Sequence, residues 1–194
     1  MGTGEVFDHC DRELQLAVWH GRLHILAQTD PEHVMHKTSI DLPLQTRDAM
    51  ARLLNARLAD TIDLSLQIKQ AHWNVKGPNF IALHELFDRL HGEAEAYYDD
   101  IAERVTALGG TAYGTSKTVA ENSTLPDYPA NITAGLDHVK ALAASYAALG
   151  KVVRADIETA SGAGDADTAD LFTGLSRGLD KTLWFLEAHL QAKA

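Results

Sequence analysis

Two histidines and three carboxylates recur at helical spacing between His72 and Arg104, and together they have the composition of a metal site. The five side chains are those of His72, His84, Asp88, Asp99 and Glu103. Imidazole supplies affinity for a divalent transition metal, whereas carboxylates stabilise a harder and more highly charged ion. This mixture suits a site for a transition-metal ion.

These residues also have a simpler interpretation. His72 continues the apolar face formed by residues 54, 58, 65 and 68, where a single histidine can be a core residue with its hydrogen bonds satisfied. Pairs such as His84 and Asp88 are common on solvent-exposed helix faces, where they contribute little. The pair Asp99 and Glu103, however, carries like charge, which is unfavourable unless a cation lies between the two carboxylates.

Helix geometry places four of the residues on one face but in two separate pairs. With about 100° of rotation per residue, Asp88, Asp99 and Glu103 lie about 40°, 60° and 100° around the helix from His84. The eleven positions from Asp88 to Asp99 correspond to roughly 16 Å along the axis. Bonds from a metal to its ligands are about 2.0–2.2 Å long. One helix therefore cannot complete a site from both pairs.

A second copy of the chain would bring the two pairs together. If two such helices pack antiparallel about a two-fold axis, His84 and Asp88 of one chain face Asp99 and Glu103 of the other. The axis passes near Gly92, where a missing side chain permits close approach of two backbones. A symmetric contact of this kind is the commonest arrangement in protein oligomers. We therefore expect two sites per dimer, each shared between the subunits.

Long helices must position these residues. Apolar residues recur with helical periodicity, and pairs of glycine or of glycine and proline interrupt the pattern. We expect helices from Thr46 as N-cap to about Val75, from a cap at Asn79 to about Leu108, from a cap at Asn131 to about Ala160, and from Thr168 to about Leu190. Residues 109–130 are long for a connection between neighbouring helices and indicate a crossover. These features predict an all-α, ferritin-like four-helix bundle.

Composition limits the class of protein. The chain has 194 residues and a hydrophobic content of 45%, which suits one domain with a packed core. Its formal net charge of −10 argues against a general attraction to polyanions. The single cysteine, Cys10, excludes an intrachain disulfide and is consistent with a reducing cytoplasm. No apolar run approaches the length of a membrane span, so no membrane partner is expected.

Residues 1–44 fit the helical pattern poorly, and we expect a flexible N-terminal extension before a bundle domain at residues 45–194. Acidic residues precede the apolar segment of this extension, which argues against a secretory signal. Its five histidines are irregularly spaced, which favours incidental histidines over a metal-binding tail. Met35 is a candidate for the natural start, with residues 1–34 as an upstream extension, and the intact mass of the native protein would decide.

Several segments resemble the Dps family, the mini-ferritins that protect DNA in starved or oxidatively stressed bacteria. They are HWNVKGPNF, LHELFD, DDIAERV, LGGTAYGTS, DADTADLFTGLSR and LDKTLWFLEAHL, and the similarity covers residues 46–190. In that family the ferroxidase site lies between two subunits. The resemblance implies that two irons per site are bound by His72, His84 and Asp88 of one chain with Asp99 and Glu103 of its neighbour. Asp88 is the best candidate for a ligand that bridges two irons.

The resemblance also implies an oxidoreductase that oxidises Fe(II), prefers hydrogen peroxide as oxidant, and stores ferric mineral inside a hollow dodecamer. Consuming iron and peroxide together would protect DNA, because hydroxyl radicals would not form. Trp73, beside His72, would absorb stray oxidising equivalents, although packing at the helix end is an equal alternative. The implied location is the cytoplasm, in association with the nucleoid.

An acidic cluster, Asp165, Asp167 and Asp170, lies at the expected start of the last helix. Its members can cap the helix and interact favourably with its positive end. In the Dps family this region lines pores on three-fold axes, where three copies would attract cations. The sequence leaves both interpretations open.

His91 and Glu95 lie on the ligand face and are expected to form hydrogen bonds at the interface rather than bind iron.

The sequence departs from the best-known members of that family in its charge. Those members carry a lysine-rich tail, and neutralising phosphates is the main source of affinity for DNA. Residues 1–48 contain eight acidic residues and only four basic ones. The basic residues are Arg12, Arg22, Lys37 and Arg47. Direct DNA binding is therefore expected to be weak, and a nucleoid protein with little ferroxidase activity is the alternative function.

A bacterioferritin site inside one bundle needs Glu-x-x-His motifs, which the chain lacks.

Overall fold

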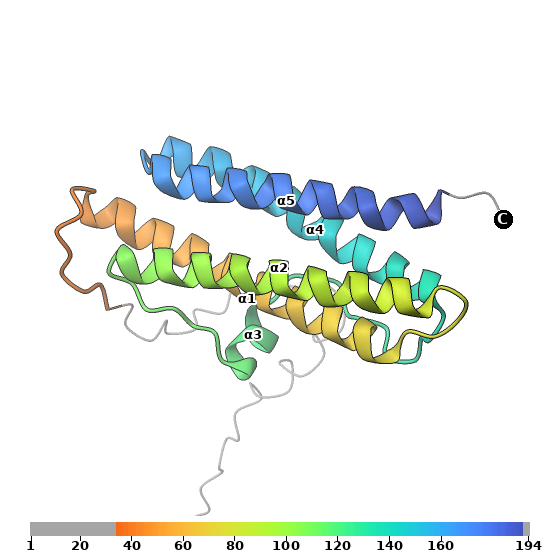
Figure 1. The fold of residues 1–194 in the computed structure, drawn as a ribbon. Helices are drawn as coiled ribbons and strands as arrows, with labels where there is room; N and C mark the ends of the chain where they lie inside the picture. The colour runs from red at the N-terminus through yellow and green to blue at the C-terminus, as the bar shows by residue number, and fades with distance from the viewer. Residues whose placement is uncertain (1–33, 192–194) are drawn as a thin grey trace, which may run out of the picture. The chain divides into compact units, whose positions relative to one another are not determined.

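The structure, a computed structural model, describes residues 34–191, and their regular structure is helical (Figure 1). The helices are α1 Leu44–Asn74, α2 Phe80–Ala107, α3 Ser116–Asn122, α4 Gly135–Gly162 and α5 Ala166–Leu190. The four long helices form a bundle in which α1 packs along α2 and α4 packs along α5. Within the described range the only strand-like pairing is one bridge, between Lys76 and Ala134. The predicted all-α four-helix bundle with a crossover after its second long helix is confirmed.

The apolar core fixes the rotation of α2 about its axis. Its buried residues recur every three or four positions along one face, and they are Leu83, Phe87, Leu90, Ala94, Ile101 and Val105. Burying a side chain of this size stabilises the fold by about 1.5–3 kcal/mol. Because this face must point inward, the face that carries His84, Asp88, Asp99 and Glu103 points away from the core. None of the helices in the described part of the chain is long and apolar enough to cross a membrane.

Polar side chains on α1 hold the crossover against the bundle. The buried Asp60 carboxylate accepts hydrogen bonds from the backbone N–H and the hydroxyl of Thr124, at 2.6 and 3.1 Å. The Gln67 amide donates to the carbonyl oxygen of Pro126 at 3.1 Å. The crossover also contains α3, a short helix that we did not predict from the sequence. The crossover therefore follows α1 along much of its length instead of looping freely.

The predicted starts of two helices are wrong. The first helix begins at Leu44. Its N-cap is Pro43, three residues before the predicted cap Thr46. The third long helix, α4, begins at Gly135 rather than after Asn131. Its start is delayed because Thr133 accepts a backbone hydrogen bond from Lys76 at 2.8 Å, which keeps residues 133–134 extended beside the end of α1.

The last part of the predicted N-terminal extension lies against the bundle. The His36 backbone N–H donates to the carbonyl oxygen of Gly109 at 2.7 Å, and Met35 and Leu42 pack against the core. Gly109 has a φ of 91°, and a Cβ there would lie 2.4 Å from the His36 carbonyl oxygen. Glycine therefore permits this close approach. The predictions for residues 1–33, including Cys10 and most of the histidines, fall outside the described residues.

A buried charged cluster links α1 to α4. Nitrogen atoms of the Arg57 guanidinium lie 3.3 Å from an Asp60 oxygen and 3.4 Å from an Asp156 oxygen. All three side chains are at most 11% exposed. Burial raises the pKa of the Asp156 carboxyl, although the Arg57 charge opposes this effect. Arg57 thus supplies positive charge that compensates two buried acidic groups.

We expect Arg57→Met to lower the free energy of unfolding by about 3–5 kcal/mol, because it leaves buried carboxylates without their cation. Lys117→Met is the matched control, since Lys117 pairs with Glu121 at the surface and its side chain is 85% exposed. That control should change the free energy by no more than about 0.5 kcal/mol. Chemical denaturation followed by circular dichroism, at equal protein concentration, measures both values. Similar losses for the two variants would contradict a stabilising role for the cluster.

Candidate metal site

His72 and His84 form the centre of the candidate site. His72 lies in the last turn of α1 and His84 near the start of α2, and the connecting loop turns at Gly77, which has a φ of 114°. The two imidazole rings stack with their centroids 3.8 Å apart and their planes at 23°. Nδ1 of each ring lies 3.0 Å from the backbone carbonyl oxygen of the other histidine.

These reciprocal hydrogen bonds set the tautomer of both histidines. A carbonyl oxygen only accepts hydrogen bonds, so each Nδ1 must carry the proton. In the neutral rings the Nε2 atoms then keep their lone pairs, which are the atoms that bind a metal. Holding the other ring nitrogen in this way orients a ligating histidine and raises its basicity.

Asp88 lies one helical turn beyond His84 and is 59% exposed. Its carboxylate oxygen is 3.9 Å from His72 Nδ1 and accepts a hydrogen bond from Lys69 Nζ at 2.6 Å. The Lys69 ammonium, through this hydrogen bond and its charge, holds the pKa of the Asp88 carboxyl below its usual value. Asp88 is therefore ionised at neutral pH. We call His72, His84 and Asp88 the histidine half-site.

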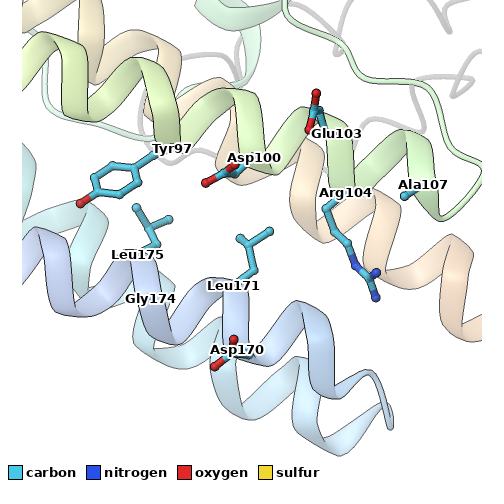
Figure 2. Close-up of a pocket in the computed structure, with 9 residues that line it drawn as sticks. All are labelled: Tyr97, Asp100, Glu103, Arg104, Ala107, Asp170, Leu171, Gly174 and Leu175. Atoms are coloured by element: carbon cyan, nitrogen blue, oxygen red, sulfur yellow. The ribbon is translucent and has the colours of Figure 1, made fainter.

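Asp99 and Glu103, which we call the carboxylate half-site, lie farther along the exposed face of α2. Glu103 is at the edge of a cleft of about 620 Å³ between α2 and α5, whose other acidic residues are Asp100 and Asp170. Figure 2 shows Leu171 of α5 pointing across this cleft, whereas the Glu103 side chain points away from α5. The Glu103 carboxylate is thus directed away from α5, and both Glu103 and Asp99 are exposed.

One chain does not bring the two half-sites together. Both lie on α2, but the eleven positions from Asp88 to Asp99 separate them by roughly 16 Å of helix. Across residues 34–191, no three His, Cys, Asp or Glu side chains are arranged to hold a metal ion. The structure therefore brings His84 and Asp88 close to His72 without completing a metal site, and the carboxylate half-site lies apart from them.

The three residues of the acidic cluster have different environments. Asp165 is buried, caps α5 by accepting a hydrogen bond from the Thr168 N–H at 3.0 Å, and lies 2.7 Å from an Arg104 nitrogen. Asp167 is 86% exposed, and Asp170 lines the α5 side of the cleft. The capping interpretation therefore describes Asp165, and only Asp167 and Asp170 present their carboxylates to solvent.

Residues around the histidine half-site also make contacts that sequence reasoning did not identify. Nδ1 of His91 lies 2.9 Å from the Ser65 hydroxyl, so this histidine is tied to α1 within its own chain. Trp73 is 69% exposed, so it does not pack in the core of its own chain. Lys69 was missed as a partner of the site. Its position three residues before His72, on the same face of α1, was the available signal.

Comparison with known proteins supports the same family that the sequence motifs indicate. A family model described as a ferritin-like domain matches residues 51–193. The DNA protection during starvation protein of Agrobacterium fabrum is 48% identical over 159 residues, covering 82% of this chain and 98% of that protein. The fine tangled pili major subunit of Haemophilus ducreyi is 36% identical over 160 residues, covering 80% of this chain and 84% of that protein.

Solved structures show the same similarity. The tetragonal form of Mycobacterium smegmatis Dps superposes with a TM-score of 0.78 at 32% identity, covering 82% of this chain and 96% of that one. DpsC from Streptomyces coelicolor has a TM-score of 0.80 at 30% identity, covering 83% and 94% of the two chains. Because sequence and fold agree over most of the bundle, the chain belongs to the Dps family of ferritin-like proteins.

Proposed function

We propose that this protein oxidises Fe(II) to Fe(III), preferentially with hydrogen peroxide, and stores the product as ferric mineral, which protects DNA from oxidative damage. The observation that carries the proposal is the pair of reciprocal hydrogen bonds between His72 and His84. They leave Nε2 of each neutral ring available to a metal, and the Asp88 carboxylate lies 3.9 Å from His72 Nδ1. This is a donor set that binds Fe(II) and retains Fe(III).

Each ligand has a distinct role in this chemistry. The imidazoles provide affinity for Fe(II), and the carboxylates stabilise the Fe(III) that forms. Asp88 would bridge two irons, and iron would then displace its hydrogen bond with Lys69. Two Fe(II) ions each give one electron to hydrogen peroxide, whose O–O bond breaks to form two hydroxide ions. No hydroxyl radical is released when both electrons are transferred at the site.

The missing ligands would come from a second subunit. Asp99 and Glu103 point outward on the same helix, so a two-fold axis near Gly92 brings them to the histidine half-site of the other chain. A Cβ at Gly92 would meet nothing within 4 Å in the single chain, so its own fold does not require glycine there. Exposed apolar side chains lie close in sequence to the histidines of the histidine half-site, including Ile81 at 60% and Trp73 at 69%. A subunit contact would bury them.

The proposed assembly is the hollow dodecamer of the Dps family, with iron as substrate and two irons in each shared site. Asp167 and Asp170 would supply negative charge where three subunits meet, which would attract Fe(II). Asp165 contributes less to this negative charge, because it is buried and paired with Arg104. The cytoplasm, near the nucleoid, is the proposed location.

Mixing two inactive variants tests whether the site is shared. His84→Ala disables the histidine half-site and Glu103→Ala the carboxylate half-site, so each homodimer should lose peroxide-driven Fe(II) oxidation. After reassembly of an equal mixture, half of the dimers are mixed and each contains one intact site. We expect about one quarter of the wild-type activity to return, as the two-fold symmetry requires.

A second mixture provides the matched control. His84→Ala and Asp88→Ala alter the same half-site, so no combination of these subunits restores an intact site. Native mass spectrometry should first confirm that subunits exchange in both mixtures. Equal activities for the two mixtures would show that the ligands do not come from different subunits.

The alternative function, a nucleoid protein with little ferroxidase activity, is tested by DNA mobility. The formal net charge of −10 disfavours binding to phosphates. We expect the assembled protein to leave a DNA fragment unretarded in a low-salt gel while the same preparation oxidises Fe(II). Retarded DNA together with no iron oxidation would favour the alternative.

A further inference from the structure

Tyr128 and His138 form a hydrogen-bonded pair that the iron site does not use. Tyr128 lies in the crossover and His138 in the first turn of α4. The Tyr128 hydroxyl is 2.6 Å from His138 Nδ1, and the ring planes differ by 18°. Burial raises the pKa of Tyr128 and lowers that of His138. At neutral pH the tyrosine is therefore a protonated donor and the histidine an uncharged acceptor.

The second nitrogen of His138 is also unusual. Its Nε2 is buried and makes no hydrogen bond with the described part of the chain, although the residue is only 1% exposed. The Asn74 backbone raises the pKa of His138 and so opposes the larger, lowering effect of burial. A proton arriving at Nδ1 would make His138 a cation, and the Asn74 backbone would help to stabilise it.

Backbone contacts hold this pair against the end of α1. Asn74 follows Trp73 and His72 directly in the chain, so His138 lies next to the segment that carries the iron ligand. The hydrogen bond from Lys76 to Thr133, at 2.8 Å, fixes the start of α4 there. Gly135 packs closely as well, since a Cβ would lie 2.5 Å from the Leu83 side chain. A contiguous path leads from His72 through Trp73 and Asn74 to His138.

We propose that Tyr128 and His138 form a proton-coupled redox relay that reduces one-electron oxidants produced when peroxide meets iron. This inference rests on the proposed function for the source of the oxidant. In the first step the Tyr128 O–H bond breaks, its electron passes to a hydroxyl radical, and its proton passes to His138 Nδ1. The products are hydroxide, a neutral phenoxyl radical at Tyr128 and a protonated His138.

The relay is reset by the iron substrate. An Fe(II) ion gives one electron to the phenoxyl radical and becomes Fe(III), and His138 returns the proton to Tyr128. The sum is the reduction of a hydroxyl radical to hydroxide by one Fe(II). The relay thus completes the two-electron reduction of peroxide whenever only one electron is delivered at the iron site.

The test uses the full-length, iron-free protein, so it does not depend on ferroxidase activity. Flash photolysis with a ruthenium tris(bipyridine) photo-oxidant generates a one-electron oxidant, and electron paramagnetic resonance detects tyrosyl radicals. We expect Tyr128→Phe to lose more than half of the wild-type signal. His138→Gln, which accepts a hydrogen bond but not a proton, should lose a similar share. The control is Tyr146→Phe, a tyrosine only 2% exposed on α4, and it should keep the signal.

The outcomes separate this inference from the proposed function. An unchanged signal in Tyr128→Phe, or full radical formation in His138→Gln, would overturn the relay. Circular dichroism and the assembly mass would show that the variants fold. With iron and peroxide, Tyr128→Phe should release more hydroxyl radical to a spin trap than the wild type does. Absence of iron oxidation in the wild type would overturn the proposed function and leave the flash result intact.

Discussion

The length of α2 between its two groups of ligands is the constraint on which the rest of the site depends. Asp88 and Asp99 share a helix face, but the eleven positions between them correspond to roughly 16 Å. No change of side-chain conformation closes that distance to the bonds of about 2.0–2.2 Å that a metal requires. The rigid helix that displays both half-sites also prevents them from meeting in one chain, and catalysis would then depend on assembly.

The bundle serves this arrangement by fixing the direction of each half-site. Leu83, Phe87 and the other buried residues of α2 turn the ligand face outward. Reciprocal hydrogen bonds then fix the two histidine rings in the tautomer that a metal needs. Ligands whose conformations are locked by packing and hydrogen bonds lose less entropy when iron binds. The crossover also helps to fix the position of His72, because its contacts with α1 hold the helix end that carries this residue.

Periodicity in the sequence was sufficient to predict the four long helices and the position of the candidate ligands on them. His84, Asp88, Asp99 and Glu103 do share α2, because local spacing determines which face of a helix a residue occupies. Features that depend on contacts between distant segments were not predictable in this way. Thr46 and Asn131 are of residue types that often cap helices. The starts of α1 and α4 nevertheless depend on where neighbouring segments lie. The pairing of Asp165 with Arg104 likewise joins residues far apart in the sequence.

Crystals of the assembled protein soaked anaerobically with Fe(II) provide the most direct test of the shared site. Anomalous scattering at the iron absorption edge locates the metal independently of the protein density. We expect iron bonded at about 2.0–2.2 Å to His72, His84 or Asp88 of one subunit and to Asp99 or Glu103 of a second subunit. Iron bound entirely within one chain, or no iron near His72, would contradict a site built by two subunits.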